Sequence, residues 1–418
     1  MGVSQYGRRV AVVAGCRTPF LRAGSEANEL TAVDLARHAT RELLIRSELP
    51  GAEVELVVMG QVVASPLAPN LAREVSLLPQ FPRDVPAYTL NEACASASQA
   101  IANAVTEIAM GHVDVAVAGG AESLSNVPIL HSKLMSDTLV ALSRAKTLGK
   151  RLGLLGRIRP RDLVPVAPAI AEPSTGLTMG QSAEKMAKEN RISREAQDEF
   201  ALRSHRRAAA ASDDGRLTAE IAPLFVRGEA CIRDNGIRAD TSLEALGSLR
   251  PVFDRRYGSV TAGNASPLTD GAAAVLLMAE EKARAFGLEP LATIRSFALS
   301  AVDPGWQLLM GPVFAVPKAL DRAGIAWSDL SVVEMHEAFA AQALSNIQAF
   351  EEQYGWTVDP DTLNVMGGSI AIGHPFGATG ARLTTTLSHE LARRDAQFGL
   401  ISVCAQGGMG FAMILERT

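Results

Sequence analysis

Short apolar runs alternate with segments of helical spacing through the N-terminal part of the chain. Continuous apolar runs predict strands covered on both faces at 9–15, 55–63, 113–118 and in the segment that ends at Leu90. Helical spacing or Ala-rich sequence predicts helices at 32–44, at 70–78 and after Cys94 to about Met110. This alternation predicts a layered α/β domain with parallel strands and right-handed connections.

A similar order of elements returns near the C-terminus. The predicted elements are a helix at 317–324, a strand at 330–335, a helix at 338–350, a turn-rich loop at 368–381 that opens another helix, and a closing β pair at 398–403 and 411–415. Both parts therefore place a turn with reactive residues between a strand and a helix, which indicates an internal duplication. Two such halves would direct their loops toward one shared site.

The sequence between the two halves has a different character. It contains little strand pattern, but it carries helical segments with good N-cap signals at 182–188 and 193–211. We therefore expect three parts: an N-terminal half over 1–125 to which 257–282 return, an inserted loop domain over 126–256, and a C-terminal half over 283–418.

Composition narrows the class of protein. The 418 residues are 47% hydrophobic and only 20% charged, which is typical of well-buried globular domains. The net charge of -5 gives no overall positive field, so nucleic acid is not expected as a partner. Four cysteines without CxxC spacing predict a reducing compartment and no structural zinc. We find no signal-peptide pattern and no apolar stretch of membrane-spanning length, and expect a cytoplasmic protein.

A basic segment follows His131. Leucines are interleaved there with bases, and Asp137 is the only acid before the last of them: Lys133, Arg144, Lys146, Lys150, Arg151, Arg157, Arg159 and Arg161. The pattern predicts a basic amphipathic helix followed by a loop. Three functions fit it: packing on a neighbouring subunit, capture of a phosphate-bearing ligand, and contact with an acidic membrane surface.

Candidate chemistry begins at Cys94, which follows a polar turn and precedes Ala-rich helical sequence. The unpaired N–H groups and positive dipole at a helix N-terminus favour an anion, so we expect the thiolate form to be stabilised there. A cysteine among small apolar residues is also a common core residue. This stretch alone does not decide between a nucleophile and an inert thiol.

Three further candidates lie at strand ends or in turns of the C-terminal half. His336 ends a predicted strand, where layered α/β folds place their sites, although a structural histidine fits there as well. His374 lies between glycine and proline, in a turn that holds the ring while small neighbours leave room for a ligand. Cys404 precedes a Gly-rich turn at 407–410 whose bends would expose backbone N–H groups.

Two cysteines and two histidines on such loops fit nucleophilic acyl transfer. A thiol suits a thioester substrate because acyl transfer between sulfurs is nearly isoenergetic. A histidine or a second thiol can carry the proton. The chain has no G-x-S-x-G elbow and no G-x-G-x-x-G turn after the first strand, which disfavours a serine hydrolase and a nicotinamide dehydrogenase.

At these residues the sequence resembles the thiolase family. Five segments match family motifs in the family's order: the loop around Cys94, VTAGNASPLTDGAAA at 260–274, HEAFA at 336–340, the histidine loop at 364–382, and CAQGGMGFA at 404–412. They span nearly the whole chain, and their conjunction is highly specific. The resemblance implies a five-layered αβαβα fold of two duplicated βαβαβαββ halves, with an inserted loop domain for coenzyme A (CoA) binding and oligomer contacts.

The resemblance also implies an acetyl-CoA C-acyltransferase. Such an enzyme cleaves 3-oxoacyl-CoA with CoA, through a cysteine acyl-enzyme, to acetyl-CoA and a shortened acyl-CoA. CoA would be a co-substrate, with no permanently bound cofactor and no metal. A homodimer or homotetramer is implied.

The resemblance implies a catalytic role for each of the four candidate residues. Cys94 would be the acylated nucleophile and His374 the base that activates it. Cys404 would protonate the acetyl-CoA enolate and later deprotonate the incoming CoA. His336 and His374 would form the oxyanion hole for the enolate.

Supporting roles follow from the same comparison. The backbone N–H of Cys94 and one from the turn at Gln406 and Gly407 would hold the tetrahedral oxyanion, and Asn364 would support the histidine loop. Four residues would line the pantetheine arm of CoA: Met179, Ala262, Ser266 and Phe339.

Two departures from the commonest short-chain pattern indicate the branch. Biosynthetic thiolases usually have Asn in place of His336 and Gly in place of Gln406. With the long basic insert at 131–161, these features resemble the beta subunit of the fatty-acid-oxidation trifunctional complex. We therefore expect degradative thiolysis, with a hydratase/dehydrogenase alpha subunit or peripheral membrane contact as candidate partners of the insert.

Three rival functions stay open at this point. One is acetyl-CoA acetyltransferase (acetoacetyl-CoA thiolase) activity in the biosynthetic Claisen direction. Another is a decarboxylating ketoacyl synthase, which Cys404 disfavours. The third is a catalytically silent lipid-binding or scaffold relative, which would show no alkylation burst at Cys94.

Overall fold

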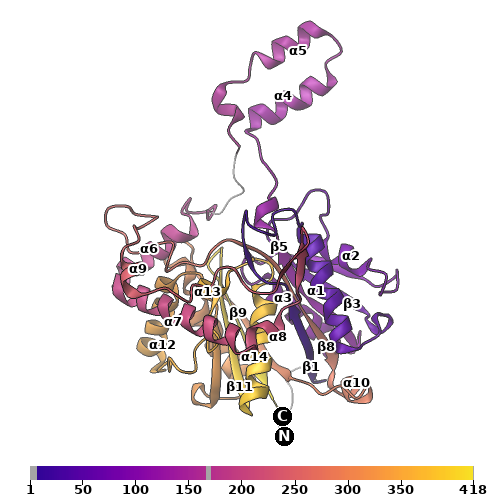
Figure 1. Cartoon of the computed structure of the whole chain (residues 1–418), viewed down its shortest axis with the longest axis vertical. Coiled ribbons are helices and arrows are strands. Elements are labelled where there is room, and N and C mark those ends of the chain that lie inside the picture. The colour runs from indigo at the N-terminus through magenta and orange to yellow at the C-terminus, as the bar shows by residue number, and fades with distance from the viewer. Residues whose placement is uncertain (1–6, 166–170, 418) are drawn as a thin grey trace.

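The strands of both halves are hydrogen-bonded in one continuous mixed order, and the strands of each half form one β layer (Figure 1). The computed structural model describes residues 7–165 and 171–417. The N-terminal half contributes β1 (Val10–Arg17), β8 (Thr269–Ala279), β5 (Val115–Glu122), β3 (Leu56–Gly60) and β4 (Ala87–Leu90), in that spatial order, and the short β2 (Leu21–Arg22) pairs with β8. The C-terminal half contributes β9 (Ala292–Ala301), β12 (Met409–Glu416), β11 (Phe398–Ala405) and β10 (Leu330–Met335).

The direction of the strands differs from the prediction. Among the described residues, β3/β4, β3/β5 and β10/β11 are parallel, whereas β8 is antiparallel to β1 and β5, and β12 is antiparallel to β9 and β11. The expectation of parallel strands is therefore wrong for the middle of the N-terminal half, where β8 lies antiparallel between β1 and β5. β8 and β9 were not predicted as strands, and β8 is the strand that breaks the parallel order between β1 and β5.

Three hydrophobic clusters define five layers. The outer cluster of the N-terminal half packs α1 (Ala32–Ser47) and α2 (Leu71–Ser76) on one face of its strands, through residues such as Leu43 and Leu276. The middle cluster holds α3 (Ser96–Ala109) and α14 (Thr379–Arg394) between the strands of the two halves. The third packs α11 (Gly311–Ala323) and α12 (Ala340–Tyr354) on the far face of the C-terminal strands. The order is α, β, α, β, α.

Each helix has a sequence pattern that suits its layer. α1 is amphipathic and begins with a Thr31–Asp34 capping box, so it can bury one stripe and leave the other in water. α14 is buried at nearly every position from Thr379 to Leu391, as expected for a helix covered on all sides. α11 begins at Gly311 rather than at Pro317. Pro312 lies in its first turn, where the missing N–H costs no helical hydrogen bond, and Pro317 lies inside the helix.

The inserted part packs on the hydrophobic clusters of both halves. It contains α6 (Met179–Glu189), α7 (Arg194–Asp213), α8 (Arg216–Glu220), a hairpin of β6 (Leu224–Val226) and β7 (Glu229–Cys231), and α9 (Leu243–Gly247). α6 and α7 are capped by Thr178 and Ser193 and pack on the same cluster as α12. Two short helices complete the main elements, α10 (Glu280–Ala285) and α13 (Ser369–Ile372).

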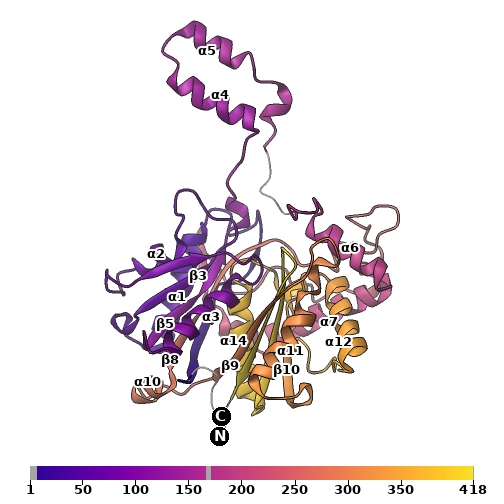
Figure 2. The same ribbon diagram turned by 180° about the vertical axis from the view of Figure 1, so that it is seen from behind.

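Residues 127–165 form an arm that projects from the body at the top of Figures 1 and 2. The predicted single helix is instead two, α4 (Lys133–Arg144) and α5 (Leu148–Leu155). They are separate because Ala145 is extended and Thr147 caps α5. Several large apolar side chains of the arm are exposed, Leu148 at 73% and Leu152 at 60% among them. Within the described part of the chain, no helix is long and apolar enough to cross a bilayer.

The two halves also touch backbone to backbone beside the histidine loop. A Cβ on Gly120 would lie 2.0 Å from the Gly377 carbonyl oxygen and 2.5 Å from that of Gly60. A Cβ on Gly377 would lie 2.6 Å from the same Gly60 oxygen. No side chain fits here, so the loop that carries His374 lies directly against the ends of β3 and β5.

Candidate active site

Cys94 lies in a tight turn between β4 and α3, one residue before the N-cap Ala95. The turn is closed by Ser96, whose hydroxyl accepts from the Glu92 N–H at 2.8 Å and donates to the Ala93 carbonyl at 2.7 Å. Ala93 has a φ of 47°, in the left-handed region that non-glycine residues rarely adopt. Such strain is typical of functional turns, and here the surrounding hydrogen bonds hold the thiol in place.

His336 and Cys404 come from neighbouring parallel strands. His336 directly follows β10, and its N–H donates to the Ser402 carbonyl of β11 at 2.8 Å. Cys404 lies two residues further along β11 and pairs with Gly410 of β12. The carboxyl ends of parallel strands share one edge of a sheet, so both side chains arrive at the same edge.

His374 reaches this point from the loop between α13 and α14. Gly373 has a φ of 113°, and His374 bridges to Leu268 of the N-terminal half. The carboxylate of Glu122, at the end of β5, accepts the Gly377 N–H at 3.0 Å. The loop is therefore fastened to both halves.

The structure brings all four candidate side chains together. The His336 and His374 rings lie 4.1 Å apart between centroids. The Cys94 Sγ and one nitrogen of each ring lie within 4.8 Å of one another. Burial raises the pKa of the Cys404 thiol well above its ordinary value, and the charge of the nearby Cys94 acts in the same direction. Both histidines and Cys404 are buried, and Cys94 is partly exposed.

The electrostatics reverse one expectation. Burial raises the pKa of the Cys94 thiol to about 12, against the opposing effect of the Gln406 N–H. The predicted stabilisation of a thiolate by the helix N-terminus is therefore wrong, because loss of solvation dominates. Burial also lowers the pKa of His374 to about 3 and that of His336 well below its ordinary value, with the Arg382 charge acting in the same direction on both. The resting site holds thiols and neutral imidazoles.

The turn after Cys404 divides its N–H groups between two tasks. The Gln406 N–H is directed at the Cys94 thiol. The Gly407 N–H instead donates to the Glu172 carboxylate at 3.0 Å, and the Gln406 side chain donates to the Ala171 carbonyl at 3.0 Å. Gln406 is thus the residue of this pair with a backbone donor facing the nucleophile, and Gly407 holds the turn.

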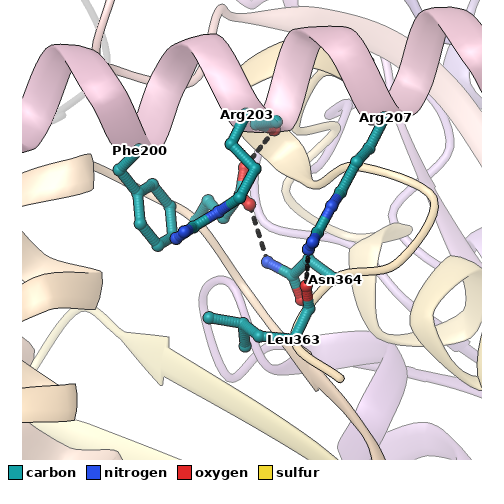
Figure 3. Close-up of a pocket in the computed structure, with 7 residues that line it drawn as sticks. Phe200, Arg203, Arg207, Leu363 and Asn364 are labelled. Carbon is teal, nitrogen blue, oxygen red and sulfur yellow. Dashed lines mark hydrogen bonds between the residues drawn. The ribbon is translucent and has the colours of Figure 1, made fainter. Parts of the chain in front are cut away.

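Asn364 supports the histidine region through a buried polar network (Figure 3). Its side chain accepts from the Met335 N–H at 2.7 Å and donates to the Met335 carbonyl at 2.9 Å, directly before His336. It also donates to Glu337 at 2.7 Å, and Ser204 of α7 donates to the other oxygen of that carboxylate at 2.7 Å. In Figure 3 Asn364 and Leu363 lie below α7, where Arg207 donates to the Leu363 carbonyl.

The four residues predicted to line the pantetheine arm are only partly gathered. Met179, at the start of α6, and Phe339 pack on the same hydrophobic cluster. Ser266 is bonded to the Ala338 carbonyl through both its N–H and its hydroxyl at 3.0 Å, which places it beside Phe339. Ala262 lies exposed on the same loop as Ser266.

Several residues of this site were missed from the sequence alone. Ser369, Thr379 and Arg382 surround the two imidazoles, and Glu172 holds the Cys404 turn. The first three lie inside the matched 364–382 segment, so their position there was the available signal. Glu172 has no such signal, because its role depends on a contact 235 residues away in the chain.

The same groups have the spacing of a metal site. Cys94, His336 and His374 are the cluster of this kind found among the described residues. Thiolate and imidazole are ligands that zinc accepts. The thiol would have to lose its proton to bind a metal, and a bound ion would occupy the position that an acyl group needs.

Two thiols and two neutral imidazoles, gathered where two layered α/β halves meet, define a cysteine-dependent acyltransferase. Comparisons with known proteins agree. Models for "Thiolase, N-terminal domain" and "Thiolase, C-terminal domain" match residues 10–281 and 288–417. The chain belongs to the thiolase family. The predicted family, fold class and acyltransferase activity are confirmed.

Individual relatives match over nearly their full length. The chain is 48% identical to a 3-ketoacyl-CoA thiolase of Escherichia coli strain 55989, covering 99% of this chain and 98% of the relative. The crystal structure of human mitochondrial 3-ketoacyl-CoA thiolase in complex with CoA is 35% identical, with a TM-score of 0.87 and coverage of 100% and 99%. The Bacillus anthracis acetyl-CoA acetyltransferase is 33% identical, with a TM-score of 0.85 and coverage of 99% and 100%.

Proposed function

We propose that this protein cleaves 3-oxoacyl-CoA with CoA, giving acetyl-CoA and a shortened acyl-CoA, in fatty acid beta-oxidation. The observation that carries the proposal is the convergence of Cys94, Cys404, His336 and His374 from both halves of the chain. The printed names of the bacterial and human relatives support the same substrate class. CoA acts as a co-substrate.

The first half-reaction forms an acyl-enzyme. Cys94 Sγ attacks the 3-oxo carbon while Nε2 of His374 takes the thiol proton. The N–H groups of Cys94 and Gln406 donate to the oxyanion that develops, a type of interaction worth on the order of 10² to 10³ in rate. The carbon–carbon bond then breaks and acetyl-CoA leaves as an enolate, whose oxygen accepts from His336 and protonated His374. Cys404 gives its proton to the enolate carbon.

The second half-reaction returns each proton. The Cys404 thiolate takes the proton of the incoming CoA thiol, and the CoA sulfur attacks the acyl group on Cys94. Cys94 leaves as a thiolate and recovers its proton from His374. Both thiols and both imidazoles end in their starting state, which agrees with the neutral resting groups.

The remaining expectations complete the proposal. We place the pantetheine arm of CoA along Met179, Ala262, Ser266 and Phe339, and we keep the division into two halves and an inserted loop domain. The exposed apolar side chains of the arm favour a homodimer or homotetramer. A cytoplasmic location, a hydratase/dehydrogenase alpha partner and peripheral membrane contact remain proposals, and the exposed basic and apolar residues of the arm support the last two.

Steady-state thiolysis across acyl chain lengths tests the proposed function. Wild-type protein should cleave medium- or long-chain 3-oxoacyl-CoA faster than acetoacetyl-CoA, and Cys94→Ser and Cys404→Ser should each lose activity. Cys231→Ser is the matched control, because that thiol lies in the β6/β7 hairpin. Unchanged activity in both Cys94→Ser and Cys404→Ser would overturn the mechanism. A preference for acetoacetyl-CoA would favour the biosynthetic alternative, which the Bacillus relative's name keeps in view.

A further inference from the structure

The two active-site imidazoles have different hydroxyl partners. His336 Nδ1 lies 2.9 Å from the Ser369 hydroxyl, and His374 Nδ1 lies 2.6 Å from the Thr379 hydroxyl. The Nε2 atom of each ring is buried and has no hydrogen-bond partner among the described residues. The Nε2 atoms are therefore the nitrogens left for the thiol and the substrate, and the hydroxyls decide which of them carries a proton.

The Ser369 hydroxyl must donate its proton to His336. Arg382 Nη2 donates to the Ser369 oxygen at 3.3 Å, and a guanidinium can only donate. The single Ser369 proton then has one acceptor among the described residues, Nδ1 of His336. A ring that accepts at Nδ1 and stays neutral carries its proton on Nε2.

Thr379 is arranged in the opposite sense. Its hydroxyl donates to the Pro375 carbonyl at 3.0 Å, the same one-turn bond that Thr384 makes to the Gly380 carbonyl at 2.9 Å. With its only proton used, the Thr379 oxygen can only accept at His374 Nδ1. His374 therefore carries its proton on Nδ1, and its Nε2 holds a free lone pair.

We propose that Ser369 and Thr379 hold the two active-site histidines in opposite tautomers, Nε2–H on His336 and Nδ1–H on His374. The inference rests on the proposed function and assigns a different role in it to each histidine. Only His374 can take the Cys94 proton, and only His336 can donate to a substrate carbonyl before the reaction starts. Ser369, Thr379 and, through Ser369, Arg382 are positioning residues. Burial keeps both rings neutral, as this division requires.

The direct test is nitrogen NMR of the full-length protein with ¹⁵N-labelled histidine. Long-range ¹H–¹⁵N correlations show which ring nitrogen of a neutral histidine carries the proton, and His336→Asn and His374→Asn spectra assign the signals. Opposite tautomers are expected. The same tautomer in both rings, or a charged ring at neutral pH, would overturn the proposal. This result does not depend on turnover, so it is separate from any failure of the thiolase reaction.

A kinetic test uses the hydroxyls. Thr379→Val should lower kcat by about 10-fold to 100-fold with KM within about twofold, and Thr379→Ser should retain kcat. Thr384→Val is the matched control, since it removes a buried hydroxyl with the same one-turn bond and no histidine contact. The His374 signal of Thr379→Val should lose its Nδ1–H preference while that of His336 stays. Equal losses in Thr379→Val and Thr384→Val, or no loss in Thr379→Val, would contradict the role.

The Ser369 side is tested in the same way. Ser369→Ala should lower kcat by about 10-fold or more and change the His336 tautomer signal alone. Ser345→Ala serves as its control, because Ser345 is a buried serine of α12 whose hydroxyl donates to the Ala341 carbonyl. Wild-type kcat in Ser369→Ala, with an unchanged His336 signal, would remove Ser369 from the proposal.

Discussion

The active-site interior and the arm differ in burial and in the sequence separation of their contacts. Around the imidazoles, side chains are buried and most have partners: Arg382 is fully buried and lies 3.3 Å from Glu334, and Asn364 makes three hydrogen bonds to Met335 and Glu337. In the described part of the arm, the hydrogen bonds of residues 132–162 stay within the arm. Apolar side chains such as Leu148 face water there.

The difference shows which kind of contact stabilises each region. The interior is fixed by contacts among residues distant in the chain, so a change at one of them should be costly. The arm is stabilised by local hydrogen bonds within its helices. Substitutions there should therefore have little effect on the unfolding free energy or the activity of this chain. Any function of the exposed apolar surface of the arm therefore requires a binding partner outside the arm.

The largest expected contrast is in activity. Cys94→Ser should lower kcat for thiolysis by on the order of 10³ or more, because no other group replaces the nucleophile. The double variant Leu148→Ala, Leu152→Ala should keep kcat within about twofold, since both side chains are exposed on α5. Parallel assays of purified protein decide this. A large loss in the arm variant would show that the arm takes part in catalysis.

Ion pairs give the next contrast. Arg382→Met leaves the Glu334 carboxylate buried without its partner and should cost about 3 to 5 kcal/mol of unfolding free energy. Lys133→Met breaks the exposed i,i+4 pair with Asp137 on the arm and should cost less than about 0.5 kcal/mol. Denaturant unfolding of both variants measures the difference. Similar values for the two would break the comparison.

Glycines give a smaller contrast with opposite signs. Gly377→Ala places a Cβ 2.6 Å from a carbonyl oxygen of Gly60 and should cost about 1 to 3 kcal/mol. Gly153→Ala, inside α5 with nothing within 4 Å of its Cβ, should stabilise the arm helix by about 0.5 to 1 kcal/mol. Hydrogen exchange in α5 and thermal unfolding of the body follow the two effects. A destabilised α5 in Gly153→Ala would contradict this account of the arm.

The smallest expected effect concerns the thiolate absorbance of Cys94, which should be absent near neutral pH. The pKa of Cys94 is raised from its ordinary value of 9.0 to about 12, so the protonated thiol predominates near neutral pH and the thiolate forms only as pH approaches 12. The stability that this thiol contributes is present below pH 9 and is lost as pH rises through the folded-state value. Ultraviolet thiolate absorbance of wild type minus Cys94→Ser should therefore be flat near neutral pH. A thiolate signal there would restore the expectation made from the helix N-terminus.

The sequence carried most of the framework and the four reactive residues. The strand of β10 was predicted with its observed ends, and the loops of Cys94 and His374 were found because small residues and turns surround them. β8 was missed because TDGAAAVLLMA is a continuous Ala-rich run, and periodicity cannot tell such a run from a helix. The break between α4 and α5 was missed because leucines continue across it.

The finer chemistry of the site could not be read from the chain. The pKa of Cys94 depends on how much protein surrounds it, which local sequence does not reveal. The partners of the histidines depend on where Ser369 and Thr379 point after folding. The motif marked the segment that contains both residues, but it did not show which atom each one meets.

The bonds between Ala171, Glu172 and the Cys404 turn set the limit for any shortened version of this protein. A designer who replaces the arm with a brief linker can remove α4 and α5, but the excision must stop before Ala171. Beyond that point the deletion would take away the two acceptors that keep Gln406 and Gly407 in place. A minimal enzyme of this type therefore still contains a remnant of its insertion.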